Sequence, residues 1–296
     1  MVSQPDRARG RGRKLAPSPV AERALARGLP LLRPERAGDP AFAETLRAWE
    51  PDLGIVVAFG QFLPRRIREL PRLGYLVNAH ASLLPRHRGA APIAHAILAG
   101  DATTGVCAMR VEREMDAGAV GGVRETRIGP EETAGELSAR LAALAAELIA
   151  ETVELAARGA LEWREQDAAR ATLAPRIERE DARLDFREPA AALARRVRAM
   201  SPRPGAFTPW NGEPLRILAA RAVEAEPGAG GLAPGTVRLA PDGAPWIATG
   251  QGWLVPVRLQ RAGGRELDAA EFQRGRGLAD GVRLGEPPPR DPARLG

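Results

Sequence analysis

Cysteine, histidine, lysine and aromatic residues are all scarce in this chain of 296 residues. Its single cysteine, Cys107, excludes an internal disulfide, and its place in an apolar stretch favours a small buried side chain over a nucleophile. No apolar run approaches the roughly 18 residues of a membrane helix, and the first residues lack the apolar core of a signal peptide, so we expect a soluble cytoplasmic protein. Neither a paired CxxC nor an HExxH spacing is present, and we therefore predict no metal site.

The abundant residues describe an ordinary globular chain with a basic character. Hydrophobic residues make up 44% of the sequence, and because aromatics supply only 4%, the core must rest on leucine, valine, isoleucine and alanine. The formal net charge is +6, and Lys14 is the only lysine among the 43 basic residues. This charge permits an anionic partner without proving one. The length is sufficient for two domains of ordinary size.

Strands and helices alternate in the pattern of the first half of the chain. The apolar run Leu53–Phe59 is typical of a strand buried on both faces, and Tyr75–Ala81 is a second such run. Leucines at spacings of three, four and seven over Thr133–Arg158 predict a long helix with one buried face. The alternation predicts an α/β domain with a Rossmann-like, mostly parallel sheet. The remaining predicted elements are helices over Ala41–Trp49, Pro64–Leu70 and Ala91–Ala99 and strands over Val106–Val111 and Val120–Ile128.

The pattern changes after residue 180. An arginine-rich helix over Ala190–Met200 is predicted as a connector, and short strands separated by proline and glycine turns follow Pro202. Such spacing is typical of a small β-barrel, here of OB-like type. We therefore expect an α/β domain over residues 1–180, a linker over 181–200, a barrel over 201–285 and a disordered tail over 286–296. The strands predicted for the barrel are Pro214–Ala219, Gly235–Leu239, Trp246–Thr249 and Trp253–Leu259.

All three histidines, His80, His87 and His95, fall within one predicted strand–loop–helix segment. Histidine is the side chain best suited to move a proton near neutral pH, and this chain has few other places for that chemistry. The loop lies at the carboxyl end of a strand, where open α/β sheets bind ligands. Asn78 lies two residues before His80, so both side chains point to the same side of the strand. We therefore predict the functional site at this loop.

Four stretches of the chain resemble the methionyl-tRNA formyltransferase family. The most specific is NAHASLLPRHRGAAPI at residues 78–93, and Met115-Asp116-Ala117-Gly118 is similar to the D-x-G element of the family. The basic stretch QPDRARGRGRKLAPSPV at residues 4–20, which has the composition of a loop, resembles the basic loop after the family's second strand. Weaker similarities run through the C-terminal part, including PGTV, ATGQGWL and LQRAGGREL. Together they span nearly the whole chain.

The resemblance implies a co-substrate, a partner and a set of site residues. The co-substrate is 10-formyltetrahydrofolate, the partner is initiator methionyl-tRNA, the barrel binds tRNA and the protein is a monomer. Three groups of residues follow from the motif matches: catalytic Asn78, His80 and Asp116; folate-binding Ser82, Leu83, Leu84 and Pro85; and tRNA-binding Arg7, Arg9, Arg11, Arg13 and Lys14.

The residue types agree with the chemistry of formyl transfer. The reaction passes through a tetrahedral intermediate, so it needs a donor for the developing oxyanion and an acceptor for the proton of the amine. Asn78 offers the donor and His80 the acceptor, while Asp116 can fix the imidazole or help to take the proton. Ser82 as a nucleophile is the competing interpretation, but no GxSxG turn surrounds it. The alternative for the basic stretch is a merely solvated loop, without contact to tRNA phosphates.

His87 and Ala119 depart from the pattern of the family. His87 stands where the family usually has an aromatic residue, so we expect it to pack or stack, and His95 is expected to be structural. Ala119 stands where the family often has an acid.

The resemblance also starts abruptly. A first strand, a helix and most of a second strand precede the basic loop in the family, which indicates either a start codon placed too late or a degraded gene. Buried strands would then lack a neighbour, so we expect the 296 residues by themselves to be poorly stable and inactive. Two other functions stay open: a folate-dependent formyltransferase for a nucleotide or sugar amine, and a non-catalytic tRNA-binding remnant.

Overall fold

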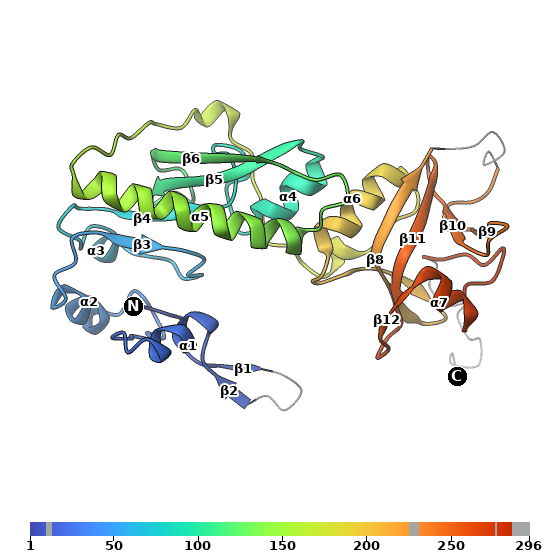
Figure 1. Cartoon of the computed structure of the whole chain (residues 1–296), viewed down its shortest axis with the longest axis horizontal. Helices are drawn as coiled ribbons and strands as arrows, with labels where there is room; N and C mark the ends of the chain where they lie inside the picture. The colour runs from blue at the N-terminus through green and yellow to red at the C-terminus, as the bar shows by residue number, and fades with distance from the viewer. Residues whose placement is uncertain (10–13, 225–230, 276, 286–296) are drawn as a thin grey trace, which may run out of the picture. The chain divides into compact units, whose positions relative to one another are not determined.

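The computed structural model describes residues 1–9, 14–224, 231–275 and 277–285 (Figure 1). Contacts divide the chain into two units, each assembled from several stretches. The first unit comprises Met1–Arg88, Gly105–Glu125 and Ala143–Thr172, and the second comprises Gly89–Thr104, Thr126–Ala142 and Leu173–Gly296. The tail expected over 286–296 lies outside the described residues. Within them, no helix is both long enough and apolar enough to cross a membrane.

A four-stranded mixed sheet with the order β3–β4–β5–β6 carries the predicted site. β3 (Gly54–Val56) and β4 (Leu76–His80) run parallel, whereas β5 (Thr103–Arg110) runs antiparallel to β4 and places Cys107 opposite His80. β6 (Val120–Arg127) returns beside β5, since the connection between them is too short for the crossover that parallel neighbours require. The Rossmann-like α/β class is confirmed. The sheet that we expected to be mostly parallel is mixed, with parallel pairing between β3 and β4 and antiparallel pairing between β4 and β5.

The strand nearest the free edge of this sheet is less buried than its sequence predicts. Among the described strands, β3 pairs only with β4. Ile55 is 39% exposed and Val57 is 58% exposed, so the run Leu53–Phe59 is not buried on both faces as expected. The interior neighbour β4 does bury Leu76 and Val77. Apolar composition alone does not distinguish an edge strand from a central one, which is why the prediction failed here.

Helix α5 (Ala134–Ala157) covers one face of the sheet, as the green ribbon in Figure 1 shows. It begins with a capping box, because the Thr133 hydroxyl accepts from the backbone N–H of Glu136 while the Glu136 carboxylate accepts from that of Thr133. The predicted leucine face is confirmed by the burial of Leu137, Leu141 and Leu148. Leu148 lies so close to Gly122 on β6 that a Cβ there would come within 2.9 Å of it. The absence of a side chain at Gly122 therefore lets the helix approach the sheet.

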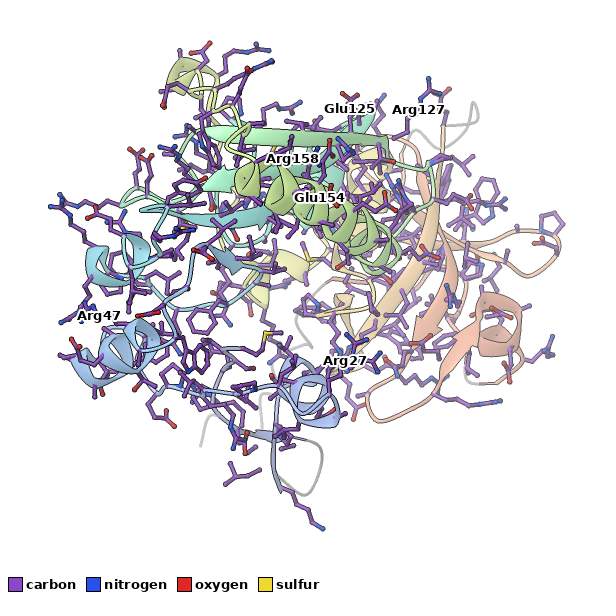
Figure 2. The ribbon with its side chains drawn as sticks, turned by 60° about the vertical axis from the view of Figure 1, so that its left-hand side comes forward. Arg27, Arg47, Glu125, Arg127, Glu154 and Arg158 are labelled. Carbon is purple, nitrogen blue, oxygen red and sulfur yellow. The ribbon has the colours of Figure 1, made fainter. Side chains whose placement is uncertain are left out.

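Charged side chains on the outer surface of the first unit stabilise its helices through an ion pair and through charges at helix ends. Glu154 in the last turn of α5 and Arg158 just after the helix end form an ion pair of 3.1 Å (Figure 2). Arg27 and Arg47 lie at the carboxyl ends of α1 (Pro19–Ala26) and α2 (Pro40–Arg47), where positive charge complements the helix dipole (Figure 2). Each of these contacts is exposed, so each contributes little by itself.

The basic stretch at residues 4–20 is more ordered than its composition predicts. β1 (Arg7–Arg9) and β2 (Lys14–Ala16) form an antiparallel hairpin with Arg7 opposite Ala16. The Ser18 side chain then caps α1 by accepting from the N–H of Ala21. The interpretation as a loop was therefore wrong for both strands, because proline marks the start of α1 rather than a loop over the whole stretch. Short α3 (Arg65–Arg68) replaces the longer helix expected over Pro64–Leu70.

The second unit begins with helices that match their predictions closely. α4 (Pro92–Ala99) ends at Gly100 in the left-handed conformation, and α6 (Ala190–Met200) has the predicted bounds. Leu193, Val197 and Met200 on α6 are fully buried. Between α5 and α6, a stretch that the structure describes in full, the only helical turns are two short 3₁₀ turns, Ala168–Arg170 and Glu180–Ala182. Helix α6 is therefore part of a packed core within this unit.

A six-stranded antiparallel sheet follows α6, in the order β7–β8–β11–β10–β9 with β12 beside β11. The long neighbours β8 and β11 form its centre (orange in Figure 1). Residues 281–285 close the sheet into a barrel-like layer, because Val237 near one edge bonds to Val282 while the N–H of Gly285 donates to Pro209 on β7. The bounds are β7 Ala206–Trp210, β8 Glu213–Val223, β9 Val237–Leu239, β10 Pro245–Ala248, β11 Trp253–Gln260, β12 Glu266–Asp268 and α7 Ala269–Arg274.

Candidate active site

The last residues of β4 carry the polar pair that the sequence predicts. Asn78 and His80 lie two residues apart on this strand, opposite Met109 and Cys107 of β5. Because strand side chains alternate, both point to the same face of the sheet. His80 is 5% exposed, whereas Asn78 is half-buried. The predicted pairing of an amide donor with an imidazole on one face is therefore present.

One hydrogen bond determines which nitrogen of His80 carries the proton. His80 Nε2 lies 2.9 Å from the backbone carbonyl oxygen of His87. A carbonyl oxygen only accepts, so Nε2 must donate, and in the neutral ring Nδ1 is then the basic nitrogen. Nδ1 faces the other way, 3.5 Å from Asp116 Oδ2. The structure therefore leaves one nitrogen of His80 able to take a proton, next to a carboxylate that stabilises the resulting cation.

Asp116 reaches His80 from a turn between β5 and β6. Its backbone is in the left-handed region, with φ of 52°, and its side chain is 15% exposed. Gly118 follows two residues later, and a Cβ there would lie 2.2 Å from the carbonyl oxygen of Arg110. The glycine of the D-x-G element is thus required because the turn packs directly against β5. The structure brings Asp116 and His80 together, as the sequence predicts.

The residues after His80 form a closed loop. Ser82 is fully buried, and its hydroxyl donates to the carbonyl oxygen of Arg86 at 2.6 Å. Leu83, Leu84 and Pro85 are half-buried, and the N–H of Leu84 donates to Cys107 Sγ at 3.4 Å. The Ser82 hydroxyl is occupied in holding the loop, which argues against Ser82 as a nucleophile. The apolar side chains are left as the surface that this loop can offer to a ligand.

Cys107 is a buried thiol beneath that loop, and we expect it to be unreactive. Burial raises the pKa of the Cys107 thiol to about 11, with a smaller opposing effect from the N–H of Leu84. The thiolate is the reactive form, so at pH 8 the folded protein should react with a disulfide reagent far more slowly than the unfolded protein. Labelling with and without denaturant, followed by absorbance, measures this difference. Equal labelling rates would contradict the burial of Cys107.

Two further residues complete the site and were not predicted to have a role. Gln166 donates from its side-chain amide to the carbonyl oxygens of Asp116 and Gly118, and it accepts from Arg88. Arg88 lies in the RGAAPI motif, so its position could have been singled out from the sequence. Gln166 lies in an irregular stretch without periodicity, and no local pattern marks it.

The other predicted residues lie in different surroundings. His87 is 6% exposed, and its carbonyl oxygen serves His80, so it packs as expected. His95 is on α4, where Nε2 bonds to the carbonyl oxygen of Pro175 at 3.1 Å, consistent with a structural role. Arg7 and Lys14 are exposed on the hairpin, and the backbone of Arg9 is part of β1. Arg11 and Arg13 lie outside the described residues.

Comparisons with known proteins give the family. The Formyl transferase model matches residues 1–153, and the model for the Formyl transferase C-terminal domain matches residues 176–277. The Methionyl-tRNA formyltransferase of Roseiflexus sp. (strain RS-1) is 43% identical over 286 residues, which cover 97% of this chain and 87% of the relative.

Solved structures support the fold. HypX from Aquifex aeolicus in complex with tetrahydrofolic acid has a TM-score of 0.59 and 20% identity, over 89% of this chain and 47% of its own. Methionyl-tRNA formyltransferase from Clostridium thermocellum has a TM-score of 0.50 and 17% identity, over 68% of this chain and 82% of its own. These likenesses are likenesses of fold. The family models and the relative at 43% identity show more: the chain belongs to the formyl transferase family, as a methionyl-tRNA formyltransferase.

Proposed function

We propose that the chain transfers a formyl group from 10-formyltetrahydrofolate to the α-amino group of methionine on initiator tRNA. The observation that carries this proposal is the geometry at the end of β4, where Nδ1 of His80 faces Asp116 Oδ2 at 3.5 Å and Asn78 shares the face of His80. The similarity to methionyl-tRNA formyltransferases over 97% of the chain supports the acceptor. Because the product is consumed in translation initiation, we also propose that the enzyme is cytoplasmic. From the family resemblance we propose that it acts as a monomer.

Each proposed residue has one task in the reaction. The methionyl amine attacks the formyl carbon, and the carbonyl oxygen becomes an oxyanion to which the Asn78 amide donates. His80, held by its Nε2–H bond to His87, takes the amine proton on Nδ1, and Asp116 stabilises the imidazolium. The bond from the formyl carbon to N10 then breaks, and the proton passes to N10. The products are formylmethionyl-tRNA and tetrahydrofolate, so atoms and charge balance.

We propose that the loop Ser82–Pro85 holds the folate. The half-buried side chains of Leu83, Leu84 and Pro85 offer an apolar surface for a flat ring system. Ser82 contributes through the loop, since its hydroxyl is engaged by the carbonyl of Arg86. The loop follows His80 directly, which brings a bound formyl donor to the catalytic pair.

The reaction itself is the first test. Formyl transfer is measured for the 296 residues and, beside them, for a form extended upstream by the first strand and helix that precede the basic loop in the family. Each form is incubated with 10-formyltetrahydrofolate and methionyl-tRNA, formylmethionyl-tRNA and tetrahydrofolate are measured together, and the extended form is the background for all variants. We expect both products in equal amounts, and faster formation with initiator than with elongator methionyl-tRNA. Free methionine and an amino-sugar nucleotide serve as alternative acceptors. Faster transfer to the amino sugar would contradict the proposal, and so would binding of methionyl-tRNA without any formylation.

We further propose that the basic stretch at residues 4–20 binds tRNA phosphates. Replacing Arg9, Arg11 and Arg13 together by alanine should weaken tRNA binding and reduce the salt dependence of its logarithm by about 0.7–0.9 for each phosphate that is no longer bound. Binding is measured by filter retention over a series of salt concentrations. The matched control removes three exposed arginines elsewhere, namely Arg47, Arg127 and Arg158. An equal change of slope in both triple variants would mean that only net charge matters.

A further inference from the structure

The turn that carries Asp116 is held by a side chain from another segment. Its φ of 52° is in the left-handed region, which aspartate tolerates but which does not by itself fix the position of the turn. The same turn must hold the Asp116 carboxylate 3.5 Å from His80 Nδ1. Its carbonyl groups at Asp116 and Gly118 are directed to one common partner, Gln166. The support therefore comes from a side chain remote in sequence.

The Gln166 amide uses all of its bonding capacity in this position. Its Nε2 donates to the carbonyl oxygens of Asp116, at 2.8 Å, and Gly118, at 2.7 Å. Its Oε1 accepts from Nε and Nη2 of Arg88, at 3.0 and 2.8 Å. Because arginine only donates and carbonyls only accept, the amide has a single possible orientation. Rotating it by 180° would set donor against donor at Arg88 and acceptor against acceptor at the two carbonyl oxygens.

Arg88 is itself held in place by the segment that also contacts the neighbour of His80. It is 7% exposed, and its backbone N–H donates to the carbonyl oxygen of Thr172 at 2.9 Å. The Thr172 hydroxyl accepts from the N–H of His87 at 2.9 Å, and His87 supplies the carbonyl that orients His80. The stretch from Gln166 to Thr172 therefore contacts both partners of the catalytic pair, His80 through residue 87 and Asp116 directly.

We propose that Gln166 is a positioning residue for formyl transfer, which Arg88 orients and which sets the Asp116 carboxylate against His80. The inference rests on the proposed function, because it assigns Gln166 a task only if Asp116 takes part in the reaction. Gln166 touches neither reacting group and acts through the backbone of the Asp116 turn. Two hydrogen bonds to one turn fix both its distance from Gln166 and its orientation, whereas a single bond would leave the turn free to rotate about that bond.

Loss of the two donors should affect turnover rather than substrate binding. In Gln166→Glu the side chain keeps its shape and still accepts from Arg88, but it presents an oxygen to the two carbonyls. We expect kcat to fall by about 10- to 100-fold, as is typical when a catalytic group is misplaced by about 1 Å. The KM values for 10-formyltetrahydrofolate and methionyl-tRNA should remain near those of the wild type. Gln166→Leu, which also removes one partner of Arg88, should lower kcat in the same way, and a thermal melt shows whether it is folded.

A double-mutant cycle with Asp116→Asn separates positioning from general stability. Asparagine tolerates the left-handed conformation and removes only the charge. If Gln166 acts through the Asp116 carboxylate, Gln166→Glu should cause no further loss of kcat in the Asp116→Asn background. Equal losses of kcat from Gln166→Glu in both backgrounds would overturn the inference, and so would wild-type kcat in Gln166→Glu. If Asp116→Asn is itself fully active, the proposed role of Asp116 fails instead, which distinguishes the two failures.

Discussion

His80→Ala is expected to lower kcat for formyl transfer by about 10²–10⁴-fold, the range that a positioned acid–base group contributes. The substitution removes the one nitrogen, Nδ1, that is both basic and next to Asp116 Oδ2. It should leave the dissociation constant for methionyl-tRNA nearly unchanged, because His80 is 5% exposed and offers no surface to the tRNA. Steady-state kinetics and filter binding on the same preparation measure both quantities.

His95→Ala is the matched control for this prediction. The substitution removes the same type of side chain, and His95 also bonds to a backbone carbonyl. His95 lies on α4, however, and its partner is Pro175, which is not part of the candidate site. We expect His95→Ala to turn over like the wild type. Thermal melts of both variants show whether a loss of activity comes from unfolding. A His80→Ala variant with wild-type turnover would contradict the assignment of His80 as the proton acceptor.

Asn78→Ala is expected to lower kcat by about 10²–10³-fold, as loss of one oxyanion donor does in comparable sites. A loss of 10³ corresponds to about 4 kcal/mol of transition-state stabilisation. This exceeds the 0.5–1.5 kcal/mol or so that an ordinary hydrogen bond contributes to stability, so the effect belongs to the reaction and not to folding. Asn78→Asp should be at least as slow, because its carboxylate would repel the oxyanion. Kinetics with saturating 10-formyltetrahydrofolate isolate this step.

Asn211→Asp provides the control for the charge change at Asn78. Asn211 is the only other asparagine, lies in the turn between β7 and β8, and has φ of 51°, which aspartate tolerates. It should turn over like the wild type. Substrate binding unchanged with turnover reduced is the expected result for Asn78→Asp. If Asn78→Asp instead raised only the KM for the folate, Asn78 would be a binding residue without a role in the transition state.

The local elements of the site were predictable because short-range rules govern them. A run of apolar residues ending in Asn78 and His80 predicts a strand with both side chains on one face, and β4 confirms it. The leucine spacing of α5 and the bounds of α6 followed from helical periodicity in the same way. Where periodicity is absent the predictions failed: the hairpin β1–β2, the proline-containing strand β7 and the short helix α7 were all missed.

Composition, motifs and local periodicity establish which chemical groups are available, on which strand face they lie, and to which family their motifs are similar. The protonation, position and exposure of these groups depend on the three-dimensional fold. The proton on Nε2 of His80 depends on the carbonyl of His87, and the position of Asp116 depends on Gln166, 50 residues further along the chain. The exposure of β3 likewise depends on its place at the sheet edge. Periodicity reports neighbours a few residues apart, whereas these contacts join distant segments whose approach is set by the packing of the whole fold.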